Sequence, residues 1–437
     1  MVQEREDNYL YGFITYVTNS HIRCLMKIYN ILKKINLAKK RGQLLNKITR
    51  EIALNFKKLI IPSVLKRWTE VNPRKIVFLN FKGNGFGCNQ KYIALELLSR
   101  NLDYDIVWLT KSTVSAQHFP PGIRIVKYLS IASFKELATA KIWCNNQSFN
   151  AFIKLGLVKK ENQVYIQTFH GSLGIKKIGE AIASYDPNNV PGWVSLIRKD
   201  ADMIDYLISN SVWESDVVYK SRFYGKGECC LFGHPRNDIF FKPNSSDIVK
   251  QVKQKLQISS GVRICLYVPT YRDSGNWNCY DVDYDRLRIA LGERFGGQWT
   301  IVVRFHPNMS REKCKKLLTA SLCNATEYPD IQELLLAADA VITDYSSCIF
   351  DYMLTKRPGF IFATDLDEFN NDRGFFYPME STPFPIAYNN DELERNILNF
   401  NLEEYLKKTE DFLQEKQCVE NGSASKSVVN LIENIIG

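Results

Sequence analysis

The stretch KIVFLNFKGNGFGCNQKYIALELLSRNLDYDIVWL, residues 75–109, decides the fold. It begins with a short apolar run, Lys75–Phe81, which has the length of a buried strand. Glycines follow, and then Lys91–Arg100 has the composition and spacing of a helix. A second apolar run, Asp105–Leu109, predicts another strand. Strands that alternate with helices in this way are typical of parallel βαβ units.

The same alternation continues along most of the chain. Further strands are predicted in the first half at Arg124–Tyr128, Lys141–Asn145, Val164–Thr168, Tyr206–Ser209 and Gly227–Leu231. The pattern restarts after a polar loop, with strands at Val262–Val268, Trp299–Phe305, Ala340–Thr343 and Gly359–Phe362. Helices are predicted at Ile248–Leu256, Tyr284–Leu291, Ile331–Ala337, Cys348–Leu354 and near the C-terminus. We therefore expect two doubly wound, Rossmann-like α/β domains, residues 71–241 and 242–437.

Composition places the chain among globular proteins. Hydrophobic residues make up 45% of the 437 residues and charged residues 24%, which excludes a disordered or fibrous chain. No run approaches the about 18 apolar residues that suggest a membrane span. The 11 cysteines are scattered, and no Cys/His group has the spacing of a zinc site. We therefore expect free thiols in a reducing cytosol.

The basic charge of the chain is concentrated near the N-terminus. Between His21 and Trp68 there are 13 Lys or Arg residues and one acid, Glu51. Apolar residues recur there three or four positions apart, which predicts amphipathic helices. We interpret residues 1–70 as a basic helical arm that associates with an anionic membrane surface. A helical arm packed on the core, or a nucleic-acid-binding segment, is the alternative, but the arm lacks the interleaved aromatic residues of the latter.

One candidate for catalysis follows a strand of the first half. Ligands bind at the carboxyl ends of the strands in parallel sheets, so polar residues just past a strand are the ones to examine. The segment QTFHGSLGIKKIG, residues 167–179, places His170 in such a position. Gly171 permits a tight backbone, and Lys176 adds positive charge. The imidazole suits a general base, although a histidine satisfied by loop hydrogen bonds would give the same pattern.

Two segments of the second half suit phosphate binding. In RFHP, Arg304 and His306 lie at the end of a predicted strand, where a cation and an imidazole can bind an anion; a turn histidine is the alternative. In VPTYRD, the planar guanidinium of Arg272 can bind a phosphate through two nitrogens, or it can pair with Asp273.

A third segment, AVITDYSSCIFD at residues 340–351, passes from a strand into a helix. Asp344, Ser346 and Ser347 lie at the junction. The N–H groups of a helix start, together with two hydroxyls, form an anion cradle, whereas ordinary capping needs one such residue. We expect no metal site. The pair Asp281 and Asp283 matches the DxD motif of some glycosyltransferases, but it falls in a predicted loop.

In this order, these strings resemble the CDP-glycerol glycerophosphotransferase family of teichoic-acid primases and polymerases. The resemblance covers roughly Asn72 to the C-terminus and rests on FHGSLGIKKIG, GHPRND, PTYRD and YPDIQELLLAADAVITDYSSCIFD. It implies a GT-B-like fold. It also implies that a polyol phosphate passes from a CDP-polyol to a hydroxyl of a membrane-linked glycan or polyol-phosphate acceptor, with release of CMP. The implied location is peripheral, at the cytoplasmic face of the cell membrane.

The resemblance also implies roles for particular residues. The family's two functional histidines correspond to His170 and His306, and its serine pair to Ser346 and Ser347. We expect His170 to deprotonate the acceptor hydroxyl, while His306, Arg272 and the serine pair stabilise the pyrophosphate charge. No cofactor is required, a divalent cation could assist, no nucleic acid is expected, and the chain could form a homo-oligomer. Further substrate contacts are expected from Gly171, Lys176, Arg236, Asn237, Thr270, Arg304 and Asp344.

The chain departs from the family pattern mainly in its first half. Phe169 stands where Trp is usual, Ser172–Leu173 where Thr-Pro is usual, and His234 where Tyr is usual. Gly87–Gln90 replaces a stretch that usually contains Asp-Asn-Pro. The alternatives to the implied function are a GT-B glycosyltransferase that uses a nucleotide sugar, and a membrane-docking scaffold whose site has decayed.

Deletion of residues 1–68 should release the protein from anionic liposomes, because the deletion removes the basic amphipathic arm. Co-sedimentation with anionic vesicles measures the effect, and neutral vesicles provide the control. If the truncated protein pelleted with anionic vesicles as fully as the whole chain, the arm would not be the membrane anchor.

Overall fold

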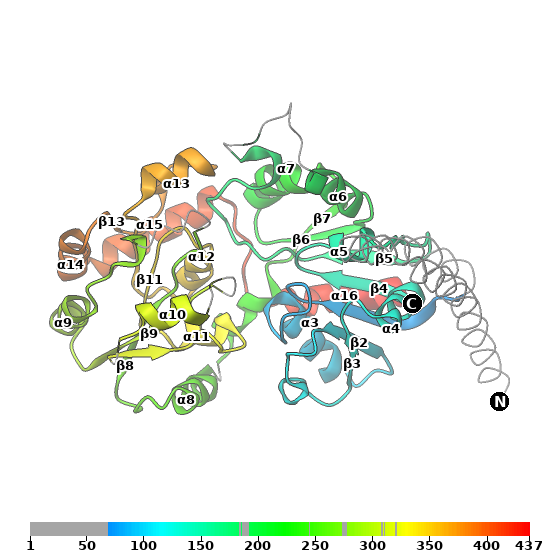
Figure 1. Cartoon of the computed structure of the whole chain (residues 1–437), viewed down its shortest axis with the longest axis horizontal. Coiled ribbons are helices and arrows are strands. Elements are labelled where there is room, and N and C mark those ends of the chain that lie inside the picture. The colour runs from blue at the N-terminus through cyan, green and yellow to red at the C-terminus, as the bar shows by residue number, and fades with distance from the viewer. Residues whose placement is uncertain are drawn as a thin grey trace, which may run out of the picture.

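The computed structural model describes residues 69–182, 185, 192–243, 245–272, 278–306, 309, 311–319 and 321–437. The expected basic arm, residues 1–70, lies almost entirely outside this range, as do Asp273 and Pro307. The described chain forms two α/β domains, each built on one parallel sheet (Figure 1).

Within the described residues, the first sheet consists of β1 (Asn72–Leu79), β2 (Asp105–Thr110), β3 (Ile123–Lys127), β4 (Ala140–Asn145), β5 (Val164–Gln167), β6 (Tyr206–Ser209) and β7 (Glu228–Leu231). All strand pairs are parallel, in the order β3-β2-β1-β4-β5-β6-β7. Ile76–Leu79 of β1 are wholly buried, which explains the continuous apolar run in the sequence. The strand order reverses between β1 and β4, and such a switch point is where Rossmann-like domains bind ligands.

The second sheet has the same winding over the part of the chain that the structure describes. Its strands are β8 (Arg263–Tyr267), β9 (Trp299–Val303), β10 (Leu322–Asn324), β11 (Ala340–Thr343), β12 (Gly359–Phe362) and β13 (Ile386–Ala387). They are parallel in the order β10-β9-β8-β11-β12-β13, so the switch point lies between β8 and β11.

Helices connect the strands of both sheets (Figure 1). Several begin at a side-chain cap, such as Ser130 before α4 and Asp330 before α11. No helix among the described residues is long and apolar enough to span a bilayer. The α-helices are α3 (Cys88–Ser99), α4 (Ile131–Thr139), α5 (Asn150–Ile153), α6 (Gly192–Ala201), α7 (Lys220–Phe223), α8 (Ser245–Lys255), α9 (Tyr284–Phe295), α10 (Arg311–Leu317), α11 (Ile331–Ala337), α12 (Cys348–Tyr352), α13 (Leu366–Asp372), α14 (Asn390–Leu398), α15 (Leu402–Glu415) and α16 (Ala424–Ile436).

The two doubly wound domains predicted from the sequence are confirmed, with two differences. The short strands β10 and β13 were not predicted, since they are only three and two residues long. The last helix, α16, packs on the first sheet rather than the second, with Val428, Val429 and Ile432 in one core with Ile93 and Leu97 of α3. The division that assigned all C-terminal helices to residues 242–437 therefore does not hold for α16, whose apolar face is buried by the first domain (Figure 1).

A buried ion pair joins the two domains. Arg236, in the 3₁₀ segment Pro235–Phe241 that follows β7, places Nε 2.9 Å from Oδ2 of Asp351 on α12. Asn237 and Gln332 donate further hydrogen bonds to the same carboxylate, at 3.0 and 3.1 Å. Burial opposes ionisation of Asp351, but the Arg236 guanidinium holds the pKa of this carboxyl below its ordinary value.

A second cluster of ion pairs connects α3 to α11. Lys91 Nζ lies 2.7 Å from Asp330 Oδ2 and 2.6 Å from Glu333 Oε1, and the Tyr92 hydroxyl donates to Asp330 at 2.9 Å. Both clusters fix the first domain to the second on the side where the strands of each sheet end.

Replacement of Asp351 by Ala should destabilise the folded chain by about 3–5 kcal/mol, because a buried guanidinium loses its carboxylate. Urea unfolding measures the free energy. Asp247→Ala is the matched control, since the side chains of Asp247 and its partner Lys250 are 73% and 75% exposed, and their ion pair should contribute little. A loss of stability no greater than that of the control would contradict the importance of the buried pair.

Candidate active site

His170 lies beside the switch point of the first sheet. β5 ends at Gln167, and the chain then turns through Phe169, whose φ of +52° is in the left-handed region. His170 Nδ1 is 2.7 Å from the carbonyl oxygen of Asn146, directly after β4. Asn146 in turn donates to the side chain of Asn80, directly after β1, at 2.8 Å. Because a carbonyl only accepts, Nδ1 of His170 carries the proton and Nε2 keeps its lone pair.

The surroundings of His170 keep its imidazole uncharged. Burial lowers the pKa of His170 to about 4, against the opposing effect of the Asn146 hydrogen bond. The positive charges of Arg236, Arg222 and Lys176 act in the same direction as burial. The ring is therefore neutral near pH 7, in the tautomer that can accept a proton.

The segment after His170 meets the second domain. The Lys177 N–H donates to the carbonyl of Gly374 at 3.0 Å. A Cβ at Gly174 would lie 3.8 Å from the Cβ of Ser347, so the backbone there passes close to the start of α12. Two segments that the sequence analysis identified separately, around His170 and around Ser347, are neighbours in the structure.

Polar groups join the ends of β8 and β11 at the switch point of the second sheet. Thr270 donates its N–H to both carboxylate oxygens of Asp344, at 2.9 and 3.0 Å. Arg272 Nη2 is 2.8 Å from Asp344, its Nε is 2.6 Å from Asp365, and its Nη1 donates to the Thr270 carbonyl at 2.8 Å. Each nitrogen of Arg272 thus has a partner within the protein. This arrangement favours Arg272 as a support for the two carboxylates, not as the phosphate ligand expected from the sequence.

Two of the predicted cations differ from Arg272, since Lys176 and Arg304 have no ion pair among the described residues. Burial lowers the pKa of Lys176 to about 8; Asp344 opposes this shift, and Arg373 adds to it. Burial also lowers the pKa of Arg304, whose Nη2 donates to the Tyr328 carbonyl at 3.2 Å. A poorly solvated cation without a counter-charge is stabilised when an anion binds. These two side chains are therefore the best placed to receive a negatively charged ligand.

Sequence analysis missed Arg373 and Asp365. Asp365 follows β12 by three residues, so the rule that identified other residues beyond strand ends could have found it. Arg373 follows α13 and precedes Gly374, and only the tertiary structure brings its charge near Lys176.

The second predicted histidine, His306, is exposed beyond the end of β9, and its ring centroid lies 5.9 Å from that of Tyr271. Tyr271 is the neighbour of Arg272 in the chain, which connects His306 to the second switch point. Ser346 and Ser347 are half-buried before α12. Ser347 is the N-cap residue, yet its side chain makes no capping hydrogen bond, so ordinary capping does not account for its hydroxyl.

Arg236 and Asn237 support the domain contact rather than an open site. Asn237 Oδ1 accepts a hydrogen bond from Gln332 at 2.9 Å. Arg236 Nη2 donates to the carbonyl of Gly171 at 2.9 Å, and both side chains are buried. Gly171 therefore contributes its carbonyl to the support of the loop that carries His170.

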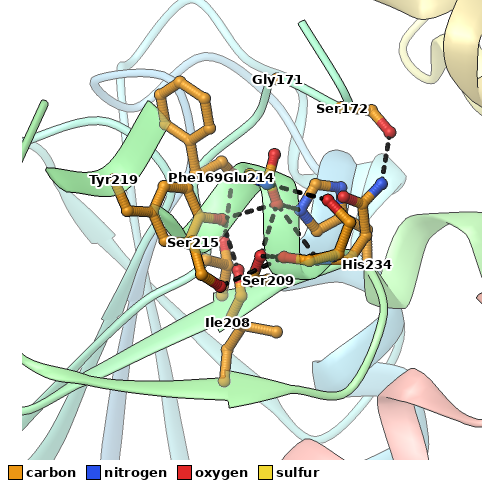
Figure 2. A network of polar contacts seen from close by, with 12 residues as sticks. Phe169, Gly171, Ser172, Ile208, Ser209, Glu214, Ser215, Tyr219 and His234 are labelled. Carbon is orange, nitrogen blue, oxygen red and sulfur yellow. Dashed lines mark hydrogen bonds and ion pairs between the residues drawn. The ribbon is translucent and has the colours of Figure 1, made fainter. Parts of the chain in front are cut away.

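Figure 2 shows a buried carboxylate behind this loop, that of Glu214. It accepts hydrogen bonds from the hydroxyls of Ser209 and Tyr219, each at 3.1 Å, and lies 3.0 Å from Nε2 of His234 (Figure 2). The Tyr219 ring packs against Phe169, with centroids 5.8 Å apart. His234, which stands where the family usually has Tyr, is thus a buried structural partner of Glu214.

No group of three or more His, Cys, Asp or Glu that could hold a metal ion occurs in the part of the chain that the structure describes. Asp283 of the DxD-like pair caps α9, where it accepts the Arg286 N–H at 3.1 Å.

Comparison with known proteins places this geometry in context. The family model described as CDP-Glycerol:Poly(glycerophosphate) glycerophosphotransferase matches residues 62–434. A teichoic acid poly(glycerol phosphate) polymerase of Staphylococcus epidermidis is 30% identical over 84% of this chain and 51% of its own length. One of Bacillus spizizenii is 27% identical over 84% of this chain and 93% of its own length. The chain thus spans about half the length of the first relative and nearly all of the second.

A solved structure of the wall teichoic acid polymerase TagF has the same fold, with a TM-score of 0.74 and 27% identity over 92% of this chain and 99% of that one. The GT-B-like architecture expected from the sequence is therefore confirmed. Because the family model matches most of the sequence, the chain belongs to the CDP-glycerol:poly(glycerophosphate) glycerophosphotransferase family.

Proposed function

We propose that the chain transfers glycerol phosphate, or a related polyol phosphate, from a CDP-polyol to a hydroxyl of a polyol-phosphate or membrane-linked glycan acceptor and releases CMP. Relatives named as teichoic acid poly(glycerol phosphate) polymerases, and a variant of TagF solved with CDPG, support this choice of donor and product. The first domain holds the acceptor and the second the donor. The chain acts at the cytoplasmic face of the membrane, where residues 1–70 attach it peripherally.

One observation carries the proposal: a neutral histidine whose Nε2 keeps its lone pair lies within electrostatic reach of an ammonium that has no ion pair among the described residues. His170 supplies the base, and Lys176 supplies the charge. Asp344, at the second switch point, also acts on the pKa of Lys176, which connects the two strand ends. A phosphoryl transfer needs these two functions, because its catalysis consists mainly of positioning and charge stabilisation.

In the proposed reaction, Nε2 of His170 takes the proton of the acceptor hydroxyl while the oxygen forms a bond to the β-phosphorus of the CDP-polyol. The bond from this phosphorus to the oxygen that bridges to the α-phosphate breaks, and CMP leaves with that oxygen. Lys176 and Arg304 stabilise the negative charge on the phosphate oxygens. His306 and the hydroxyls of Ser346 and Ser347 also stabilise the charge of the pyrophosphate on the donor side.

Donor binding also strengthens the base. The pKa of His170 is low without ligand, so the ring is unprotonated when substrates arrive. A diphosphate placed beside Lys176 adds negative charge near the imidazole, and this charge raises the pKa of His170. A base whose pKa approaches the working pH is the more effective one.

His170→Ala should lower the rate of CMP release from CDP-glycerol on the order of 10²–10⁴-fold, because the general base is lost. His118→Ala, which changes an exposed histidine outside the site, is the control and should retain its rate. A near-wild-type rate for His170→Ala would refute the assigned role. Release of a nucleoside diphosphate with a new glycoside would instead indicate a glycosyltransferase, and binding without turnover would indicate a scaffold.

Protonation of His170 should not lower kcat/KM between about pH 7.5 and 5.5. A histidine with an ordinary pKa of about 6.5 would lose about tenfold in its neutral fraction over this range. With a pKa of about 4, the neutral form of His170 persists, and it is lost only as the pH falls through that value. Initial rates at low CDP-glycerol concentration measure kcat/KM, and an acid limb near 6.5 that His170→Ala abolishes would contradict the low pKa.

A further inference from the structure

The loop that carries His170, residues 168–177, is held by hydrogen bonds from both domains. From the first domain, Asn89 Nδ2 donates to the carbonyls of Thr168 and Phe169 at 3.0 and 3.1 Å. Asn210 Nδ2 donates to the hydroxyl of Ser172, on the C-terminal side of His170, at 2.7 Å. These bonds fix the residues on both sides of His170 to the first domain.

The second domain holds the remainder of the same loop. The Tyr377 hydroxyl donates to the carbonyl of Leu173, and the Phe376 N–H donates to the carbonyl of Ile175 at 2.7 Å. Tyr377 belongs to the second domain, in the segment between α13 and β13. Two residues, Gly171 and Ser172, separate His170 from Leu173, whose carbonyl binds the Tyr377 hydroxyl.

The backbone of the loop is strained at two positions. Phe169 and Leu173 have φ values of +52° and +41°, in the left-handed region that residues other than glycine rarely adopt. Such conformations are unfavourable and persist only where surrounding contacts hold them in place. Leu173 stands where the family usually has Pro, and a proline, with φ near about −65°, could not adopt this conformation. At Leu173, the bond from Tyr377 acts on the strained residue itself.

Tyr377 is itself rigidly placed. Its ring packs against Trp213 of the first domain, with centroids 5.2 Å apart, and against Phe412 of α15, with centroids 5.9 Å apart. The ammonium of Lys416 lies 4.4 Å from the centroid of the Tyr377 ring. Burial raises the pKa of Tyr377 well above its ordinary value, so the hydroxyl keeps its proton and stays a donor. The tyrosine thus forms a fixed point between the domains.

We infer that Tyr377 is a positioning residue for His170. Through this tyrosine, the second domain holds the imidazole where it can take the proton of the acceptor hydroxyl. The role of His170 as a base rests on the proposed function, whereas the restraint of the loop by Tyr377 does not. Without the hydroxyl, the Leu173 carbonyl has lost its donor and the strained loop relaxes. A displacement of about 1 Å at a reacting group can cost about 10²-fold in rate.

Tyr377→Phe in the full chain tests this inference, because the substitution removes one hydroxyl and keeps the ring. Amide hydrogen exchange of residues 169–178, followed by mass spectrometry, reports the order of the loop without reference to activity. We expect faster exchange in this peptide, a kcat about tenfold lower and a KM for CDP-glycerol within about twofold of wild type. Tyr405→Phe is the matched control, since Tyr405 is also buried in the second domain and makes no hydrogen bond to this loop among the described residues.

Unchanged exchange and unchanged kcat in Tyr377→Phe would overturn the inference. Equal effects in Tyr405→Phe would also overturn it, because general loosening of the second domain would then explain both. If His170→Ala retained full turnover while Tyr377→Phe still accelerated exchange in the loop, the proposed function would fail and the restraint of the loop would stand. Thermal unfolding of both tyrosine variants verifies that each remains folded at the assay temperature.

Discussion

The arrangement of the site depends on one buried guanidinium, that of Arg236. It pairs with Asp351 of the second domain and donates to the carbonyl of Gly171, next to His170. Its backbone N–H also donates to Asn89, whose amide holds the carbonyl of Phe169. A single residue thus connects the domain contact to the loop that carries His170. A buried arginine requires its carboxylate, so the position of His170 is tied to the position of α12.

The cations of this region fall into two groups that a sequence cannot separate. Arg236 and Arg272 are neutralised by buried carboxylates, and their hydrogen bonds stay within the protein. Lys176 and Arg304 have no such partner among the residues described, and burial disfavours their charged forms. The first pair fixes geometry. The charges of the second pair are not offset by an ion pair among the described residues, and a diphosphate is the kind of ligand that can offset them.

Local patterns in the sequence predicted most of the fold and part of the site. β11 occupies the predicted residues Ala340–Thr343, because a strand buried on both faces needs a continuous apolar run. The rule that ligands bind beyond strand ends found Asp344 and His170. It could not find the role of Arg272, whose partner Asp365 lies 93 residues away. Pairing at that distance is decided by how the chain packs, as is the return of α16 to the first domain.

Two departures of this chain from its family lie in or beside the loop that carries His170, and each takes part in a buried contact. His234 replaces the usual Tyr and has a buried carboxylate, Glu214, as its partner. Leu173 replaces the usual Pro, and its carbonyl accepts the hydroxyl of Tyr377. A decayed site would not be expected to keep such contacts, because selection would no longer maintain the geometry of the loop. The buried contacts at both positions, next to an imidazole whose Nε2 keeps its lone pair, argue for an enzyme and against an inactive scaffold.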